Sequence, residues 1–372
     1  MTSYRRPIKP NPLGASIELD GSIRFSFVSA SEDCGIILYD KISGKRMKKL
    51  HFSTKERVGN VYCKYIDDVD PEKITYQFYA QDKLIPDERA KMFTEKHKYG
   101  KERGVKDLRA CFPNDQFDWG NDKFPRLSYE NSIFYCMHVR GFTRHPSSGV
   151  AHKGTFLGIT EKLEYLKKTG ITTIELQPAY EFNELPDVEE RRSTFKGSKD
   201  VSEEDLDRYF PRRLNYWGYK KGYYYAPKSS YAYGDDAAEE FKQMVKLLHA
   251  SGIELIMQFY FPDRMPPGEI RNILLFWVIN YHVDGFHMMG SDLPITELAK
   301  DPALADTKIL YYGFDLEKIY DKKDNFKRVL GEYNDRYLYD MRKFLKGDEG
   351  MLEKVVSHLS YNPEKCGSIH YF

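Results

Sequence analysis

From Ser132 onwards, apolar runs of strand length alternate with amphipathic runs of helix length, and this alternation constrains the fold most. It predicts strands at 133–139, 172–176, 253–259, 283–288 and 308–312. It predicts helices at 161–169, 237–251 and 269–281, the first two ending at Gly170 and Gly252. The strands are apolar almost throughout, as in a parallel sheet covered by helices. The sequence therefore predicts an α/β fold, with a (β/α)8 TIM barrel as the leading architecture and functional groups at the carboxyl ends of its strands.

The first 115 residues carry a different pattern, with short strands and polar turns. Ile23, Phe25 and Phe27 alternate with polar residues, as in a half-buried strand. Further strands are expected at 35–39, 61–65 and 74–79, and segment 86–125 is expected to be an irregular linker. We therefore expect a β-sandwich with its linker over 1–115 and a barrel over 116–372.

Composition excludes several classes of function. Lys and Arg number 57 and Asp and Glu 56, so the net charge of +1 favours neither nucleic acid nor an anionic membrane as partner. Five cysteines without a C-x-x-C spacing argue against a disulfide framework or a metal site, and for a reducing, cytoplasmic compartment. We see no signal peptide or membrane span, and we expect no cofactor. Aromatic residues reach 15%, which suits either thick cores or platforms for sugar rings.

Several segments resemble one enzyme family, in the family's own order. Residues 283–290, V-D-G-F-H-M-M-G, resemble the fourth-strand motif of the α-amylase superfamily, glycoside hydrolase family 13. Residues 135–143 and 175–182 resemble the first and second barrel strands of its pullulanases, isoamylases and glycogen-debranching enzymes. Residues 215–219, N-Y-W-G-Y, resemble the loop that lines the sugar site, and 11–15 resemble the opening of an immunoglobulin-like, starch-binding-module-like sandwich. The chain is identified as a member of the debranching-type branch, which implies α-glucans such as glycogen, starch or pullulan as ligands.

The resemblance also shows which catalytic groups are replaced. Retaining glycosidases need two carboxyl groups about 5–5.5 Å apart. Alignment places Met289 at the nucleophile position and Tyr312 at the acid/base position. A thioether cannot form a glycosyl ester, and a phenol with an ordinary pKa of about 10 is a weak acid. We therefore expect no catalytic residue at either position.

Residues that differ from the family's also stand at the end of the third strand and two residues before the nucleophile position. The family ends its third strand D-x-x-x-N-H, whereas Gln258, Pro262 and Asp263 stand at those three positions. The family's Arg is His287 in this chain. Replacements in three separate motifs, with the flanking residues in register, indicate a lost active site rather than an alignment error.

Four residues are predicted to contact a sugar. The resemblance places Trp217 and Tyr219 against a sugar ring and Tyr180 in the second loop, and His287 could hydrogen-bond a sugar hydroxyl. The alternatives are loop packing for the first two and core packing for Tyr180 and His287. Asp263 and Asp292 are the carboxylates of these loops near the expected strand ends. These two carboxylates would have to serve as the catalytic groups if the chain had rebuilt its active site.

Residues 368–372 look like the start of the seventh barrel strand, where the sequence ends. Open strand edges are prone to association, so we expect a homo-oligomer or a complementing C-terminal segment. Three functions remain open. The leading one is an α-glucan-recognising pseudoenzyme of carbohydrate metabolism. The second is an active glycosidase or transglycosidase on α-1,6 or α-1,4 bonds with repurposed carboxylates, and the third is a non-functional fragment.

Overall fold

The computed structural model describes residues 6–94, 97–114, 116–186, 191, 202–209, 211–320, 328–360 and 370–371. The chain divides into two compact units that interleave along the sequence. The first unit comprises Met1–Asp122, His138–Leu163 and Ala179–Leu247. The second comprises Lys123–Met137, Glu164–Pro178 and Leu248–Phe372. A domain boundary between residues 115 and 116 stays a prediction.

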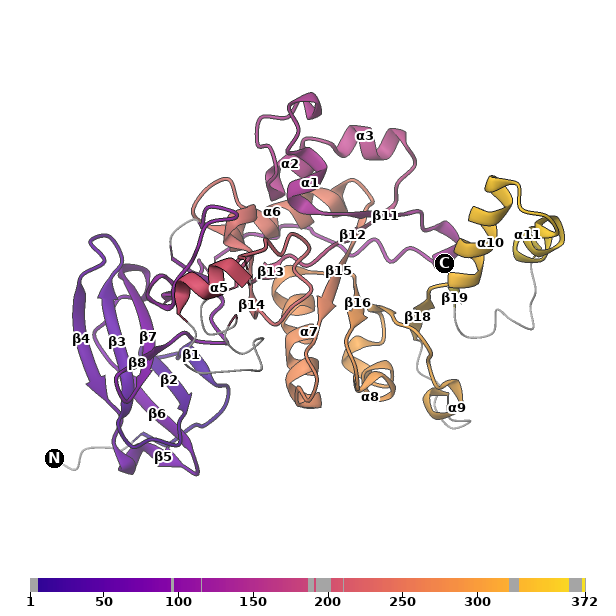
Figure 1. The fold of residues 1–372 in the computed structure, drawn as a ribbon. Helices are drawn as coiled ribbons and strands as arrows, with labels where there is room; N and C mark the ends of the chain where they lie inside the picture. Colours follow the sequence, from indigo (N-terminus) through magenta and orange to yellow (C-terminus); the bar gives the residue numbers. More distant parts are fainter. Residues whose placement is uncertain are drawn as a thin grey trace. The chain divides into compact units, whose positions relative to one another are not determined.

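Two antiparallel sheets form the N-terminal part of the first unit (Figure 1). One sheet has the order β1 (Gly14–Ile17), β2 (Ile23–Val28), β6 (Val61–Ile66), β5 (Arg57–Val58). The other has the order β4 (Arg46–His51), β3 (Cys34–Asp40), β7 (Ile74–Ala80), β10 (Ala110–Cys111), β9 (Met92–Phe93), with β8 (Lys83–Ile85) paired to β7. The strands predicted in this region are confirmed. The prediction of a wholly irregular linker over 86–125 was wrong, because β9 and β10 extend the second sheet.

The core between these sheets is aromatic. Phe27 of β2 stacks on Phe78 of β7, with ring centroids 4.5 Å apart, and Phe25 is fully buried beside them. The polar residues of β2 are buried as well, which the alternation did not predict. The Arg24 guanidinium donates to the Glu18 carboxylate and to two backbone carbonyls, so its charge is satisfied inside the sheet.

The rest of the first unit carries the short elements α1 (Val139–Thr143), α2 (Phe156–Thr160), β13 (Tyr180–Glu181), α5 (Glu203–Tyr209) and β14 (Tyr223–Pro227). It also carries most of the 14-residue helix α6 (Ala237–Ala250). Short 3-10 helices of the chain lie at Thr54–Glu56, Pro71–Lys73, Val105–Asp107, Tyr129–Asn131, Pro146–Ser148, Ser229–Tyr231 and Pro302–Leu304. The strand predicted at 133–139 ends at Met137. It ends there because the His138 side chain caps α1 by accepting a hydrogen bond from the backbone of Gly141.

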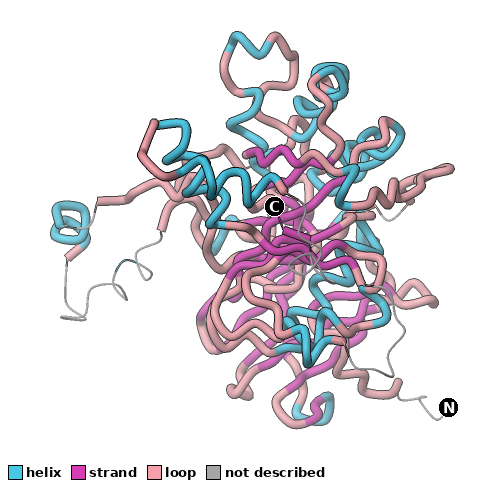
Figure 2. The backbone as a smooth tube through the Cα atoms, turned by 90° about the vertical axis from the view of Figure 1, so that its right-hand side faces the viewer, coloured by secondary structure: helices cyan, strands magenta, loops and turns pink. Residues whose placement is uncertain are grey.

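The second unit is built on a seven-stranded parallel sheet whose strand order follows the chain. Its strands are β11 (Phe134–Met137), β12 (Thr173–Leu176), β15 (Glu254–Tyr260), β16 (Gly285–Met289), β17 (Lys308–Leu310), β18 (Val329–Glu332) and β19 (His370–Tyr371). Helices α3 (Leu163–Lys168), α7 (Pro267–Tyr281), α8 (Ile295–Ala299), α9 (Leu316–Ile319), α10 (Asp335–Lys346) and α11 (Met351–Leu359) lie between these strands along the chain (Figure 1). Helices are cyan and strands magenta in Figure 2. The sheet curls into part of a barrel, so the predicted α/β fold is confirmed as an incomplete TIM barrel.

Helix α7 shows how the sequence covers this sheet. A proline at its first position and a left-handed residue at its end, His282 with φ 51°, set its limits. The fully buried Trp277 of α7 packs edge-on against Phe259 of β15, with ring centroids 5.9 Å apart. Strand β18 and helices α10 and α11 were not assigned from the sequence. Among the described residues, no helix is long and apolar enough to cross a bilayer.

Candidate functional site

The parallel strands of the second unit bring polar side chains together near their carboxyl ends. Cys136 of β11 lies in register with Glu175 of β12, and Gln258 of β15 lies in register with His287 of β16. Since alternate residues of a strand share a face, Met289 lies on the same face as His287, one step closer to the strand end. This is the end of the sheet at which the barrel fold predicts a functional site.

Glu175 is the centre of this group. One carboxylate oxygen, Oε1, accepts hydrogen bonds from His287 Nδ1 and Gln258 Nε2, each at 2.6 Å. The other, Oε2, accepts from the hydroxyl of Tyr333, which follows β18, at 2.7 Å. Burial would by itself raise the pKa of Glu175, but the hydrogen bonds from His287, Tyr333 and Gln258 outweigh it and lower the pKa. Glu175 is therefore an ionised carboxylate with both oxygens engaged.

His287 carries the one open polar atom of this network. Its ring stacks on Tyr333, with centroids 4.6 Å apart, and its Nδ1 donates to Glu175. Its Nε2 is buried and has no hydrogen-bond partner within the described ranges. Because Nδ1 is engaged with Glu175, Nε2 is the ring nitrogen left to a ligand or a water. A hydroxyl or a water would satisfy it.

The two positions expected to hold catalytic carboxyl groups lie in this layer without one. Met289 ends β16 and is half-buried, and Tyr312 follows β17 with 47% of its surface exposed. The Tyr312 ring stacks on Tyr333, with centroids 5.6 Å apart. Burial, with the charges of Asp335 and Glu175, raises the pKa of Tyr312. A raised pKa makes this phenol a poorer proton donor than an ordinary tyrosine.

Asp263 and Asp292 lie in the loops that follow β15 and β16, and both are exposed. No hydrogen bond or ion pair between described residues links them. The idea that they form a displaced catalytic pair stays a prediction.

The part of the 283–290 motif that matches the family is structural. The Asp284 carboxylate accepts from the backbone N–H of Leu255 at 2.7 Å and contacts His249 Nε2 at 3.0 Å. A Cβ added at Gly285 would lie 2.6 Å from the Cβ of Lys308, so only glycine fits between β16 and β17. The motif keeps the family's packing residues, Asp284 and Gly285. It differs from the family at His287 and Met289.

In the first unit, segment 215–219 forms a tight turn that presents Trp217. The side chain of Asn215 accepts from the backbone N–H of Gly218 at 2.9 Å. Gly218 has φ 81°, and a Cβ there would lie 2.5 Å from the ring of Phe182. The turn leaves 51% of the Trp217 surface exposed, while Tyr219 is half-buried.

A rigid aromatic cluster supports Trp217. Its ring lies perpendicular to that of Tyr216, with centroids 5.0 Å apart, and Tyr216 stacks on His138 at 4.2 Å. His138 Nδ1 accepts from the backbone of Gly141, so Nε2 carries the proton and donates to the Tyr216 carbonyl at 2.9 Å. Burial lowers the pKa of His138 to about 4, which keeps the ring neutral. An exposed Trp on fixed neighbours suits the stacking of a sugar ring.

Tyr180 lies beneath the same turn. Its side chain is fully buried, and its hydroxyl donates to the carbonyls of Gly218 and Lys220 at 3.2 and 3.0 Å. Tyr180 thus supports the turn that presents Trp217. Its contact with a ligand stays a prediction.

Sequence reasoning did not identify the buried charges below this loop. Lys228 Nζ lies 2.9 Å from Glu184 and 3.3 Å from Glu181, and His97 Nε2 lies 2.8 Å from Glu184. Burial alone would raise the pKa of Glu184, but the hydrogen bond from His97 and the charge of Lys228 lower it to about 2. These ion pairs fix β13 and β14. An ionisable residue inside an apolar run is the sequence signal that could have revealed these charges. The same signal marks Glu175 within the second strand.

Comparison with known proteins adds to this picture. Residues 94–262 match the family model for the α-amylase catalytic domain. Isoamylase 1, chloroplastic, of Oryza sativa subsp. japonica is 25% identical over 98% of this chain and 55% of its own length. The glycogen debranching enzyme of Dickeya chrysanthemi is 24% identical over 91% of this chain and 61% of its own length. The chain thus spans little more than half the length of these curated relatives.

A solved structure of a mutant pullulanase from Paenibacillus barengoltzii, complexed with maltotriose, superposes with a TM-score of 0.66. It is 21% identical and covers 91% of this chain and 59% of its own. At this identity the similarity shows a shared fold.

Proposed function

This chain belongs to the α-amylase family, with relatives among isoamylases, glycogen-debranching enzymes and pullulanases, and we propose that it binds α-glucans without hydrolysing them. One observation carries the proposal. Met289 and Tyr312 occupy the strand ends where two carboxyl groups would be required. Glu175, the buried carboxylate of the same strand-end network, already accepts three hydrogen bonds.

The chemistry of these side chains supports the absence of turnover. A thioether at position 289 cannot take up the anomeric carbon as an ester. Tyr312 is a poor acid because its pKa is raised, and the low pKa of Glu175 leaves that group without a proton to donate. Proton donation and covalent catalysis both lack a group suited to them.

Two groups support binding, one in each unit. In the first unit, Trp217 and the half-buried Tyr219 would offer stacking surfaces to sugar rings. In the second unit, His287 Nε2 would form a hydrogen bond with a sugar hydroxyl. Neither the stacking contact nor the hydrogen bond requires a carboxylate. We also propose that the N-terminal sheets form an immunoglobulin-like module that serves mainly as structure.

The test pairs turnover with binding on the purified chain. Release of reducing ends from pullulan, glycogen and maltoheptaose is expected to stay at background, while calorimetry detects binding of maltoheptaose. Trp217→Ala is expected to weaken that binding about tenfold, since an aromatic contact is worth about 0.5–1.5 kcal/mol beyond area burial and about 1.4 kcal/mol is tenfold. Tyr209→Ala, which removes an exposed aromatic side chain elsewhere in the first unit, should leave it unchanged.

Turnover that disappears in Asp263→Asn or Asp292→Asn would contradict the proposal and establish a rebuilt active site. Absence of both turnover and binding would contradict it as well. In that case the chain would be a scaffold or a fragment without glucan affinity.

A further inference from the structure

One edge strand of the first unit carries a strong excess of positive charge. Strand β4 pairs with β3 alone among the described strands, and Figure 1 shows it at the outer margin of its sheet. Segment 41–57, which contains β4, has seven Lys and Arg residues and one Glu, whereas the whole chain has a net charge of +1. A local excess of this kind attracts an anionic partner when no nearby carboxylate neutralises it.

Five of these cations have no carboxylate partner within the described ranges. All five are exposed, and they are Lys41, Lys45, Arg46, Lys48 and Lys49. The carboxylates that flank them are engaged elsewhere, since Glu56 pairs with Lys64 at 2.7 Å and Asp40 accepts from the backbone and hydroxyl of Ser43. The charge along β4 is therefore available to a partner.

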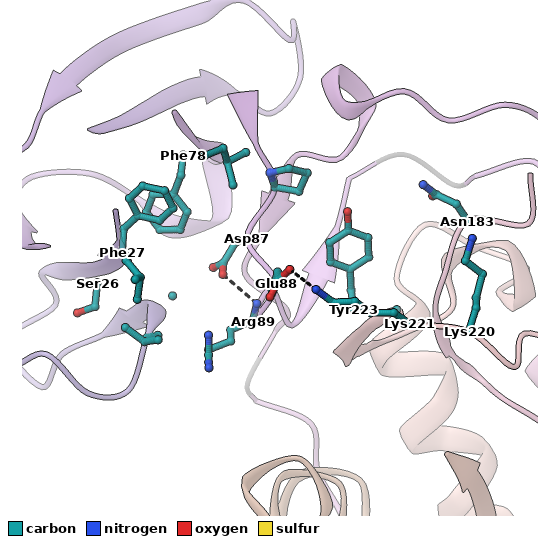
Figure 3. A pocket seen from close by; sticks show the side chains of 16 residues that line it. Ser26, Phe27, Phe78, Asp87, Glu88, Arg89, Asn183, Lys220, Lys221 and Tyr223 are labelled. Carbon is teal, nitrogen blue, oxygen red and sulfur yellow. Dashed lines mark hydrogen bonds and ion pairs between the residues drawn. The ribbon is translucent and has the colours of Figure 1, made fainter. Parts of the chain in front are cut away.

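Lysines elsewhere in the first unit are neutralised, as in the cavity of about 620 Å³ drawn in Figure 3. The Lys221 ammonium in its lining pairs with the Glu88 carboxylate at 2.7 Å, and the Asp87 carboxylate accepts from the backbone N–H of Arg89 at 2.9 Å. Because cations and anions both line this cavity, it does not select a charged partner. Strand β4 differs from it in having cations without their anions.

The backbone of β4 is open on one side as well. In an antiparallel pair, alternate residues direct their N–H and C=O groups away from the neighbouring strand. The backbone N–H of Phe52 donates to the carbonyl of Cys34 at 2.9 Å, and His51 lies opposite Gly35 in the register. His51 and Lys49 therefore turn their backbone groups towards the free side of the sheet. A row of open donors and acceptors is a template for an added strand.

Aromatic rings restrain the cations on one face of this sheet. The Lys49 ammonium lies 4.2 Å from the centroid of the Tyr79 ring, and the Arg109 guanidinium lies 3.9 Å from that of Tyr39. Burial raises the pKa of Tyr39, and the charges of Arg109 and Arg46 act against that rise, so both guanidinium groups lie near this ring. Cations held on rings lose less side-chain freedom when a partner binds than freely moving ones do.

Charged residues also protect edge strands from aggregation, but protection alone does not explain the apolar residues of this segment. Ile42, in the turn that leads into β4, is 96% exposed, and Met47 within β4 is 52% exposed. A purely protective edge gains nothing from exposed apolar side chains. Apolar side chains between unpaired cations match a partner in which acidic and apolar residues alternate.

We propose that β4 is a docking edge for an extended acidic segment of a partner protein, which adds to the sheet as a further strand. Its backbone would bond to the free side of β4, its carboxylates would pair with the cations of segment 41–49, and its apolar residues would cover Met47. Nucleic acids and phospholipids supply negative charge, but they have no backbone that could pair the alternating N–H and C=O groups. This interaction does not depend on glucan binding.

The test is fluorescence anisotropy of a labelled peptide of alternating glutamate and valine, long enough to span β4, titrated with the full chain. Binding is expected at low salt and should weaken as salt screens the charges. Lys48→Glu combined with Lys49→Glu should weaken it about tenfold, because each reversal turns attraction into repulsion. Lys101→Glu combined with Lys153→Glu is the matched control, since both lysines are exposed in the first unit outside its sheets. The control should bind as the wild type does.

A second set of probes separates strand addition from charge alone. His51→Pro removes one outward N–H and keeps all five cations, and proline is tolerated on the free side of an edge strand. It should weaken binding about threefold, since one hydrogen bond is lost, whereas His51→Ala keeps the N–H and should bind as the wild type does. The same peptide methylated at alternate backbone nitrogens should bind the wild type more weakly. Thermal unfolding of each variant checks that the chain is folded.

Other results would overturn the proposal. Equal binding of the methylated and unmethylated peptides would show that charge alone acts and that no strand is added. Duplex DNA or phosphatidylserine vesicles that bind more tightly than the peptide, and that lose binding in the charge-reversal variant, would assign the edge to a phosphate-bearing partner. No binding of the peptide to the wild type, or equal binding to the charge-reversal and control variants, would refute the docking edge itself.

Discussion

Replacing Glu175 by Gln tests whether the strand-end network holds the second unit together. The carboxylate accepts three hydrogen bonds at 2.6, 2.6 and 2.7 Å, and it is 2% exposed. An amide offers one acceptor oxygen, and its NH2 group must then face at least one of the three donors. A hydrogen bond to a charged group is worth about 1.5–3 kcal/mol, and a buried donor left unpaired costs about 1–3 kcal/mol. We expect Glu175→Gln to lower the free energy of unfolding by about 2–4 kcal/mol.

The assay is urea unfolding followed by circular dichroism, with Glu164→Gln as control. The Glu164 side chain is 90% exposed, so its replacement should change the free energy of unfolding by less than about 0.5 kcal/mol. The pKa of Glu175 is lowered, so the advantage of the wild type should be present above its ordinary value of 4.5 and should shrink as the pH falls below it. Equal midpoints for Glu175→Gln and Glu164→Gln at pH 7 would refute the network.

Two further predictions concern the packing around the candidate sites. The pKa of His138 is lowered from 6.5 to about 4, so the unfolded chain binds more protons between these values, and stability should fall by up to roughly 3 kcal/mol as the pH drops across this window. His138→Gln should lose less over the same window, as urea midpoints at pH 7 and pH 4 would measure, and an equal loss would contradict the assignment. Gly285→Ala should destabilise the chain by about 1–3 kcal/mol, because its Cβ meets Lys308 at 2.6 Å. Gly268→Ala, at a helical glycine with open space, should be neutral or stabilising in the same thermal unfolding measurement, and equal effects would show that the contact at position 285 relaxes freely.

Local sequence determined much of the fold. Five strands of the parallel sheet follow from apolar runs that end at glycine or at polar turns, because burial of both faces leaves a continuous apolar signature. The sequence also predicts that Met289 and Tyr312 stand where the family has its catalytic groups. The packing residues around them, such as Asp284 and Gly285, keep the alignment in register.

Other elements gave no such signal. Strands β9 and β10 have two residues each, too few to show a period. They form because β10 pairs with β7 and β9 pairs with β10. Strand β18 is four residues long and contains a glycine, so its sequence resembles a turn as much as a strand.

Only the tertiary structure decided which side chains meet. Glu175 bonds to His287 and Tyr333, which lie 112 and 158 residues further along the chain. That contact depends on the register of parallel strands and on which face each residue takes, and neither is encoded within a single strand. The sequence specified which chemical groups this protein possesses, and the packing of distant strands decided that His287 Nε2 is buried without a hydrogen-bond partner among the described residues.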